Sequence, residues 1–275
     1  MTDAVAAGQK GGLFSSFPDV LAAIGGRTLD FLAAFGSISR LTGETILALR
    51  LRPFPWRELL RQVNQLGVES ISIAFLTALF TGAVMALQFG WSLARFGASN
   101  YVGSVISVGF VMELGPVLTA LLVGGRVGAG ITAEIGSMKV TEQLDAIRAM
   151  GASPVHKLVL PRVLACVLTM PILALMADVV GITGGGLVAI AEQGLTPSYY
   201  FDQVLRSTHI PQVLHGLVKA TFFGFLYGII GCYEGMQTRG GTAGVGVATT
   251  RTVVLLSISI LVADYILGKM LLPFT

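Results

Sequence analysis

Several ionisable residues lie inside otherwise apolar stretches of the 275-residue sequence, and four of them stand out: Glu113, Asp178, Lys219 and Asp264. A charged side chain is costly inside a membrane, so such residues usually face a polar cavity or pair with one another, and they often mark the route of a substrate or ion. These residues are therefore the first candidates for a site. The chemistry that they offer is the recognition and pairing of charge.

Lys219 and Asp264 are predicted to share one level of the membrane. At the helical rise, Lys219 lies about 12 Å below the outer surface, and Asp264 lies about 18 Å above the inner surface of a core of about 30 Å. Opposite charges at one level on two antiparallel helices favour an ion pair. The pair has two interpretations: a fastening between helices, or part of a polar region that meets lipid headgroups. Glu113 and Asp178 fall in the same outer half of the chain's membrane region.

Two further features of the second apolar stretch have more than one interpretation. Glu113 stands just before Gly115-Pro116, where it could satisfy backbone groups freed at a helix break or take part in a charged site. Arg126 lies in the segment GGRVGAG, whose small residues suggest close helix packing, and its role is either structural or gating. This glycine-rich segment lacks the GK[ST] ending of a phosphate loop and lies in an apolar span, so we do not assign it to nucleotide binding.

Catalytic and metal-binding patterns are not found in the sequence. The three histidines are scattered, and neither an HExxH pattern nor a GxSxG pattern occurs. We therefore predict no metal site, no cofactor and no enzymatic activity in this chain. A net charge of +3 does not suggest a nucleic-acid partner, and two cysteines inside apolar stretches do not suggest a disulfide framework.

The elements that must position the charged residues are transmembrane helices. Hydrophobic residues make up 53% of the chain and charged residues 12%, too few to cover a water-soluble surface. Stretches long enough to cross a bilayer occur five times, at residues 70–91, 102–132, 163–191, 213–233 and 253–272. We therefore predict an all-α membrane protein with five transmembrane helices, the third of which is long enough to bend or tilt near its glycines.

The distribution of basic residues predicts the orientation. With the N-terminus in the cytoplasm, thirteen of the eighteen Lys and Arg residues fall on the inner side, and only Arg95 and Arg206 fall in outer loops. This asymmetry satisfies the positive-inside rule. The C-terminus is then expected on the outer side of the membrane.

The N-terminal region is predicted to lie along the inner membrane surface. Residues 1–66 are expected to form a cytoplasmic tail and interfacial amphipathic helices, at about 20–51 and 53–61, and residues 67–275 form the transmembrane domain. The alternative is a soluble tail that packs on the inner loops.

The inner loop of residues 134–162 contains a short predicted helix from Glu142 to Met150. Thr141 is expected to cap it, Glu142 and Asp145 suit its first turn, and Arg148 suits its end. Its length of roughly 14 Å is too short to cross the membrane.

An apolar face of this helix is formed by Leu144, Ile147 and Met150 at three-residue spacing. Such a face favours docking into a groove of a partner protein. The alternative is a connector that folds against the membrane.

A long block of the sequence, residues 113–165, resembles the MlaE/YrbE permease family. It reads ELGPVLTALLVGGRVGAGITAEIGSMKVTEQLDAIRAMGASPVHKLVLPRVLA, and the resemblance continues in GTAGVGVATTRTVV at residues 241–254 and in the following ADYIL. The resemblance implies a multi-pass subunit of the bacterial inner membrane, in an ABC transporter that moves phospholipids between membranes. It further implies a homodimer with a cytoplasmic ATPase, a periplasmic MCE-domain protein and often a small STAS-domain subunit. Residues 142–150 would then be the coupling helix seated on the ATPase, and residues 20–51 the interfacial helix.

One position departs from the family pattern. Many relatives carry a basic residue just before the glutamate of ELGP, where this chain has Met112, so the charge that compensates Glu113 is not evident from the sequence. Two other functions fit parts of the pattern. An autonomous secondary transporter could use the buried charges as an ion relay, and a membrane scaffold could recruit proteins through the inner loop.

Overall fold

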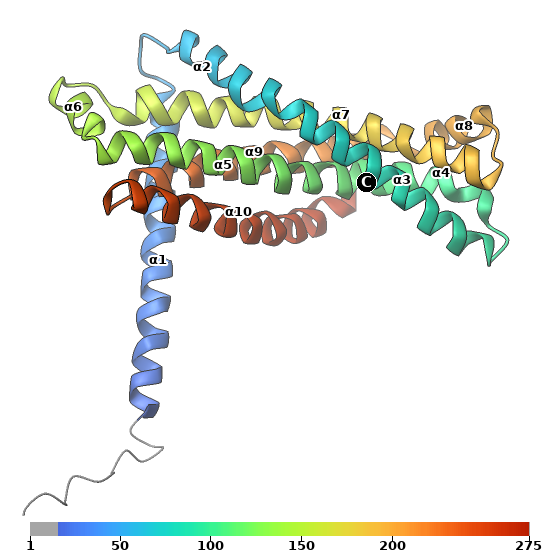
Figure 1. Ribbon diagram of the computed structural model, residues 1–275, viewed down its shortest axis with the longest axis horizontal. Helices are drawn as coiled ribbons and strands as arrows, with labels where there is room; N and C mark the ends of the chain where they lie inside the picture. Colours follow the sequence, from blue (N-terminus) through green and yellow to red (C-terminus); the bar gives the residue numbers. More distant parts are fainter. Residues whose placement is uncertain (1–15, 275) are drawn as a thin grey trace, which may run out of the picture. The chain divides into compact units, whose positions relative to one another are not determined.

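The computed structural model describes residues 16–274 of the chain, and all its regular elements in that range are helical (Figure 1). Residues 1–15 of the predicted cytoplasmic tail, which include Lys10, and Thr275 lie outside the described residues. Within residues 16–274, five continuous helical segments are long and apolar enough to cross a membrane: Trp56–Ala94, Ser99–Val140, Val155–Gln193, Ile210–Met236 and Gly241–Leu271. The predicted fold class and the predicted number of spans are therefore confirmed.

The helices follow one another along the chain with short connections. They are α1 Ser16–Ala48, α2 Trp56–Gln62, α3 Ile71–Ala94, α4 Val102–Gly109, α5 Gly115–Val140, α6 Gln143–Ala149, α7 Leu160–Gln193, α8 Pro197–Ser207, α9 Ile210–Met236 and α10 Gly241–Leu271. The chain divides into two compact units between Gly43 and Glu44. The first contains most of α1, which exposes Leu29, Leu32 and Phe35. Its placement at the membrane interface stays a prediction.

Small residues bring α3 and α7 into close contact. On α3 the buried positions recur every fourth residue, as Ala74, Ala78, Gly82, Ala86 and Gly90. A Cβ atom on Gly82 would come within 1.8 Å of the carbonyl oxygen of Gly181 on α7. The backbones can approach this closely only because Gly82 lacks a side chain. Of the α7 glycines near which a bend or tilt was expected from the sequence, Gly184 and Gly185 face α3, whereas Gly181 faces Phe110 and Gly186 faces Tyr200.

Small residues also allow α5 to pack against α10. A Cβ atom on Gly128 would lie 2.2 Å from Leu256, and the hydroxyl groups of Thr132 and Thr252 are 2.8 Å apart. The predicted close helix packing of the GGRVGAG segment is thus confirmed at Gly128, whereas a Cβ atom on Gly130 of the same segment would meet no atom within 4 Å.

A widened turn joins α4 to α5 within the second span. Residues Phe110–Leu114 form one π-helical turn, in which the N–H group of Gly115 bonds to the carbonyl group of Phe110. Pro116 has no N–H group to continue the normal α-helical pattern, so the turn before it is wider. The turn contains Glu113.

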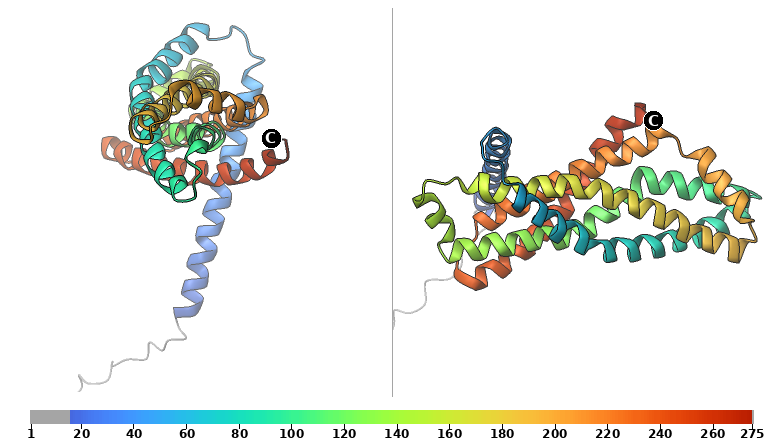
Figure 2. Two further views of the ribbon diagram at one scale, coloured as in Figure 1. Left: turned by 90° about the vertical axis from the view of Figure 1, so that its right-hand side faces the viewer. Right: turned by 90° about the horizontal axis from the view of Figure 1, so that it is seen from above.

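The two short helices α6 and α8 lie at opposite ends of the helix bundle formed by the second unit (Figures 1 and 2). Helix α8 is held there by the hydroxyl group of Tyr200, which donates to the carbonyl oxygen of Ile182 at 2.8 Å, and by a hydrogen bond of 2.9 Å from Ser104 to Gln203.

Candidate functional site

Three of the four predicted charged residues come together in one cluster. The Nζ atom of Lys219 donates to Oε2 of Glu113 at 2.6 Å and lies 2.9 Å from Oδ1 of Asp264. The short distance between Lys219 and Asp264 therefore confirms the predicted ion pair. Glu113 is a second partner of Lys219. We call Glu113, Lys219 and Asp264 the charged triad.

Each member of the charged triad is supplied by a different element. Glu113 projects from the π-helical turn, Lys219 from α9 and Asp264 from α10. Gly268, one turn beyond Asp264, leaves room for the lysine, because a Cβ atom there would lie 3.2 Å from Nζ. On α9, Gly216 lets the backbone of the widened turn approach. The triad thus depends on two glycines and on the turn before Pro116.

The three side chains differ in how far they are exposed. The side chain of Lys219 is 0% exposed, that of Asp264 22% and that of Glu113 47%. The ammonium group is therefore enclosed, and the accessible part of the triad consists of carboxylate groups. Two carboxylates around one ammonium give a formal charge of −1. Lys219 also supplies the compensating charge for Glu113 that the sequence, with Met112 in place of a basic residue, did not reveal.

An exposed carboxylate in a membrane-spanning segment does not face hydrocarbon. Ionisable groups at this depth face a bundle interior or a water-filled cavity because their desolvation is costly. The side of the bundle on which Glu113 is open therefore borders water, a ligand or another polypeptide.

The fourth predicted residue, Asp178, does not join the triad. It is buried on α7 beside Gly115, and its Oδ1 atom has no hydrogen-bond partner among the described residues. His215 lies one turn before Lys219 on α9 and is also buried, and neither ring nitrogen has a partner in the described part of the chain. Polar groups thus surround the widened turn on more than one side.

Arg126 contacts the start of the first span and lies apart from the triad. Its guanidinium group donates to the hydroxyl group of Ser70 at 2.8 Å and to Oε2 of Glu69 at 3.3 Å. These bonds tie α5 to the segment just before α3. They support the structural interpretation of Arg126.

The predicted cytoplasmic helix is present as α6, but its start differs from the prediction. The expected cap by Thr141 is wrong: its hydroxyl group donates back to the carbonyl group of Ser137 at 2.9 Å, and Glu142 precedes the helix with φ of 60°. A threonine hydroxyl bonds readily to the carbonyl group four residues earlier, so Thr141 extends the hydrogen bonding of α5. Gly151, with φ of 73°, follows the end of the helix in the left-handed conformation that glycine adopts readily.

Side chains of α6 divide between the bundle and the surface. Leu144 is buried, Ile147 is partly exposed and Met150 is exposed, so the predicted apolar stripe is not one open face. Asp145 contacts Lys139 at 3.1 Å and Arg148 at 2.9 Å, and the hydrogen bond from Lys139, together with both positive charges, lowers the pKa of Asp145.

Ion pairs at the inner ends of the helices were missed by the sequence analysis. Arg162, which is buried, pairs with Glu134 at 2.8 Å, and Glu234, also buried, pairs with Arg251 at 3.5 Å. In the sequence these residues stand at or near the ends of spans, where charges are ordinary. Nothing in their spacing shows that they meet across helices.

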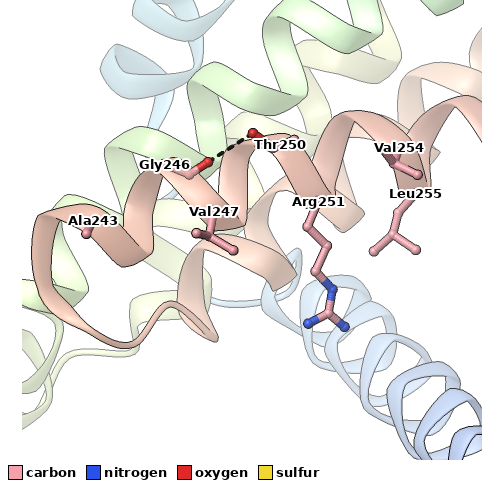
Figure 3. Close-up of a pocket in the computed structure, with 7 residues that line it drawn as sticks. All are labelled: Ala243, Gly246, Val247, Thr250, Arg251, Val254 and Leu255. Atoms are coloured by element: carbon pink, nitrogen blue, oxygen red, sulfur yellow. Dashed lines mark hydrogen bonds between the residues drawn. The ribbon is translucent and has the colours of Figure 1, made fainter.

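Helix α10 presents an open face. Near its start the surface is hollowed, and Arg251 and Thr250 lie along the hollow; the Thr250 hydroxyl donates to the carbonyl group of Gly246 at 3.1 Å (Figure 3). Farther along, apolar side chains are exposed: Val254, Ile258, Leu261, Tyr265 and Met270. Of the most apolar 18-residue stretch of α10, only 22% is buried, a smaller share than in the other spans of the described residues.

Comparison with known proteins shows one family. The family model for the permease MlaE matches residues 59–270. A probable ABC transporter permease protein of Rickettsia typhi is 40% identical over 248 residues, which cover 90% of this chain and 96% of that protein. The intermembrane phospholipid transport system permease protein MlaE of Haemophilus influenzae is 36% identical over 250 residues, covering 90% and 95%. The chloroplastic protein TRIGALACTOSYLDIACYLGLYCEROL 1 of Arabidopsis thaliana is 34% identical over 233 residues, covering 85% and 67%.

Proposed function

The chain belongs to the MlaE permease family, and from this we propose that it is the membrane permease subunit of an ABC transporter that moves phospholipids between the inner and outer membranes. ATP is hydrolysed by a separate cytoplasmic subunit, so this chain is not itself an enzyme. The similarity to one protein named as a probable ABC transporter permease and to another named as an intermembrane phospholipid transport system permease supports this assignment.

The structural observation that carries the proposal is the position of the charged triad. Its carboxylates are open on an otherwise apolar, membrane-spanning bundle, where hydrocarbon alone would not solvate them. A phospholipid combines a charged headgroup with apolar chains. A face that joins exposed charge to exposed apolar side chains is suited to such a molecule.

We expect a second copy of the chain to cover the open side of α10. Its exposed apolar residues run along the same helix that carries Asp264. In a homodimer these faces would enclose a lipid pathway between two copies, and the triads would line it. The lipid would then meet carboxylates near its headgroup and apolar side chains along its tails.

The ATPase is expected to bind at the end of the bundle that carries α6. This end is the cytoplasmic side according to the distribution of basic residues, which also places the N-terminus inside and the C-terminus in the periplasm. Because Leu144 is buried in the bundle, a push on α6 would pass directly to the long helices. Closure of the ATPase subunits would in this way narrow the pathway at the triad.

Two further partners follow from the family resemblance. A periplasmic MCE-domain protein would receive or deliver the lipid at the outer end, and a STAS-domain subunit could accompany the ATPase. An autonomous ion-driven carrier would use the same triad. It would not need a cytoplasmic helix for a partner, and the relatives named as ABC permeases favour the coupled transporter.

The proposal is tested by purifying the full chain in mild detergent and identifying the copurified proteins and lipids by mass spectrometry. We expect an ABC ATPase, an MCE-domain protein and phospholipid. Reversal of charge at Glu142 and Asp145 to lysine should reduce recovery of the ATPase while membrane insertion is unchanged. The control is Glu192→Lys, a reversal of charge at an exposed residue near the C-terminal end of α7. A folded chain that never recovers an ATPase would contradict the proposal.

A further inference from the structure

The charge that a lipid headgroup can reach in the triad is negative. Lys219 has no exposed side-chain surface, and its ammonium group is held by Glu113 and Asp264. An incoming headgroup therefore meets carboxylate oxygens and not the lysine. A phosphate group placed here would face like charge, whereas an ammonium group would face opposite charge.

Glu113 leaves one of its carboxylate oxygens for a ligand. Glu113 uses Oε2 for its bond to Lys219, and no hydrogen bond of Oε1 is present among the described contacts. A Cβ atom on Gly268 would lie 3.6 Å from Oε1, so the missing side chain at Gly268 leaves this oxygen uncovered from the side of α10. An N–H group that reaches Oε1 would form a charge-assisted hydrogen bond, which is stronger than a bond between neutral groups.

Among the described contacts, Lys219 is the one basic residue that pairs with Glu113 or Asp264, and the exposed Lys269, next to Gly268 on α10, pairs with neither. Met112, beside Glu113 in the chain, is uncharged, and Arg126 is engaged with Glu69 and Ser70 at the start of the first span. His215, buried one turn from Lys219 on the same face of α9, has ring nitrogens without partners in the described part of the chain. The polar region thus extends beyond the triad on α9 and retains unused hydrogen-bonding capacity.

We propose that the triad selects phospholipids whose headgroup carries a primary amine, with the ammonium group bound at Glu113 Oε1, over anionic phospholipids that lack a headgroup cation. This inference rests on the proposed lipid-transport function and adds the substrate class. A choline headgroup carries the charge without an N–H donor and binds less well than ethanolamine. A glycerol headgroup offers no cation and binds least.

The test measures which lipid stays bound to the full chain. The purified protein is placed in nanodiscs that contain equal amounts of phosphatidylethanolamine, phosphatidylcholine and phosphatidylglycerol. It is then re-extracted, washed in mild detergent and analysed for retained lipid by mass spectrometry. We expect retained ethanolamine lipid to exceed glycerol lipid about fivefold, the ratio given by about 1 kcal/mol for one partly exposed ion pair.

Three variants make the result specific. Glu113→Gln and Asp264→Asn each bring the formal charge of the triad to zero, and both should lower the ratio toward one. Asp202→Asn removes the same charge from an exposed position on α8 and should leave the ratio unchanged. Having two triad variants keeps the test decisive if one of them fails to fold.

Each outcome has a defined meaning. Equal retention of the lipids, preference for phosphatidylglycerol, or a preference that survives both triad substitutions would overturn the selectivity while leaving lipid transport in place. A folded protein that retains no phospholipid at all would count against the proposed function itself.

Discussion

Replacing Lys219 with methionine removes the only positive charge of the triad and keeps the length of the side chain. Glu113 and Asp264, which now lie 2.6 Å and 2.9 Å from the ammonium nitrogen, would face each other without it. Removing one partner of a fully buried ion pair destabilises a protein by about 3–5 kcal/mol. Because Glu113 is about half exposed and Asp264 about one-fifth exposed, solvent screening reduces the expected loss to about 2–3 kcal/mol.

The assay for this prediction is thermal unfolding of the full chain in detergent. A loss of this size corresponds to a fall of about 5–10 °C in Tm for a chain of this length. Lys269→Met, at an exposed lysine near the end of α10, is the matched control and should leave Tm unchanged. Adding Glu113→Gln and Asp264→Asn to Lys219→Met should recover most of the loss, since no unpaired charge would remain.

Two results would refute this reasoning. One is a Lys219→Met variant that melts with the wild type, and the other is a neutral triple variant that melts as low as the single one. A charge exchange, Lys219→Asp with Asp264→Lys, should restore stability only in part. The new aspartate at position 219 would lie beside the carboxylate of Glu113. If Lys219 paired with Asp264 alone, the exchange would restore stability in full.

Two other substitutions test the packing and the inner helix. Gly82→Val should prevent normal folding, because even a Cβ atom would come within 1.8 Å of the Gly181 carbonyl oxygen. Gly130→Val on α5 is the control and should be tolerated, because a Cβ atom there would have no atom within 4 Å. The yield of monodisperse protein measures both effects, and a well-folded Gly82→Val variant would contradict the contact. Glu142→Gly should raise Tm by removing about 1 kcal/mol of strain at φ of 60°, and an unchanged or lower Tm would mean that the left-handed conformation carries no strain.

The sequence was most informative about the spans and the pairing of Lys219 with Asp264. Apolar length alone predicts the spans, because a helix must be long enough to cross the hydrocarbon core. Depth along two antiparallel helices was enough to place two opposite charges at one level. Both inferences use one-dimensional distances, which the helical rise converts directly into position.

The remaining features depend on how helices meet, which the spacing along one helix does not report. Glu113 joins the triad because a π-helical turn and Gly216 bring its segment against α9. Asp178 was predicted in the same outer half of the membrane, but it packs beside Gly115 and does not contact Lys219. The ion pair of Glu134 with the buried Arg162 likewise requires the contact between α5 and α7.

The most direct test of the central claim is ATP-dependent lipid transfer by the purified complex. Proteoliposomes that hold the full chain with its copurified partners and a labelled phospholipid are mixed with acceptor protein or vesicles, and transfer is followed with and without ATP. We expect transfer that requires ATP and that falls sharply in the Lys219→Met variant while the ATPase still copurifies. Transfer that is absent from an intact complex, or that proceeds equally without ATP, would contradict the central claim.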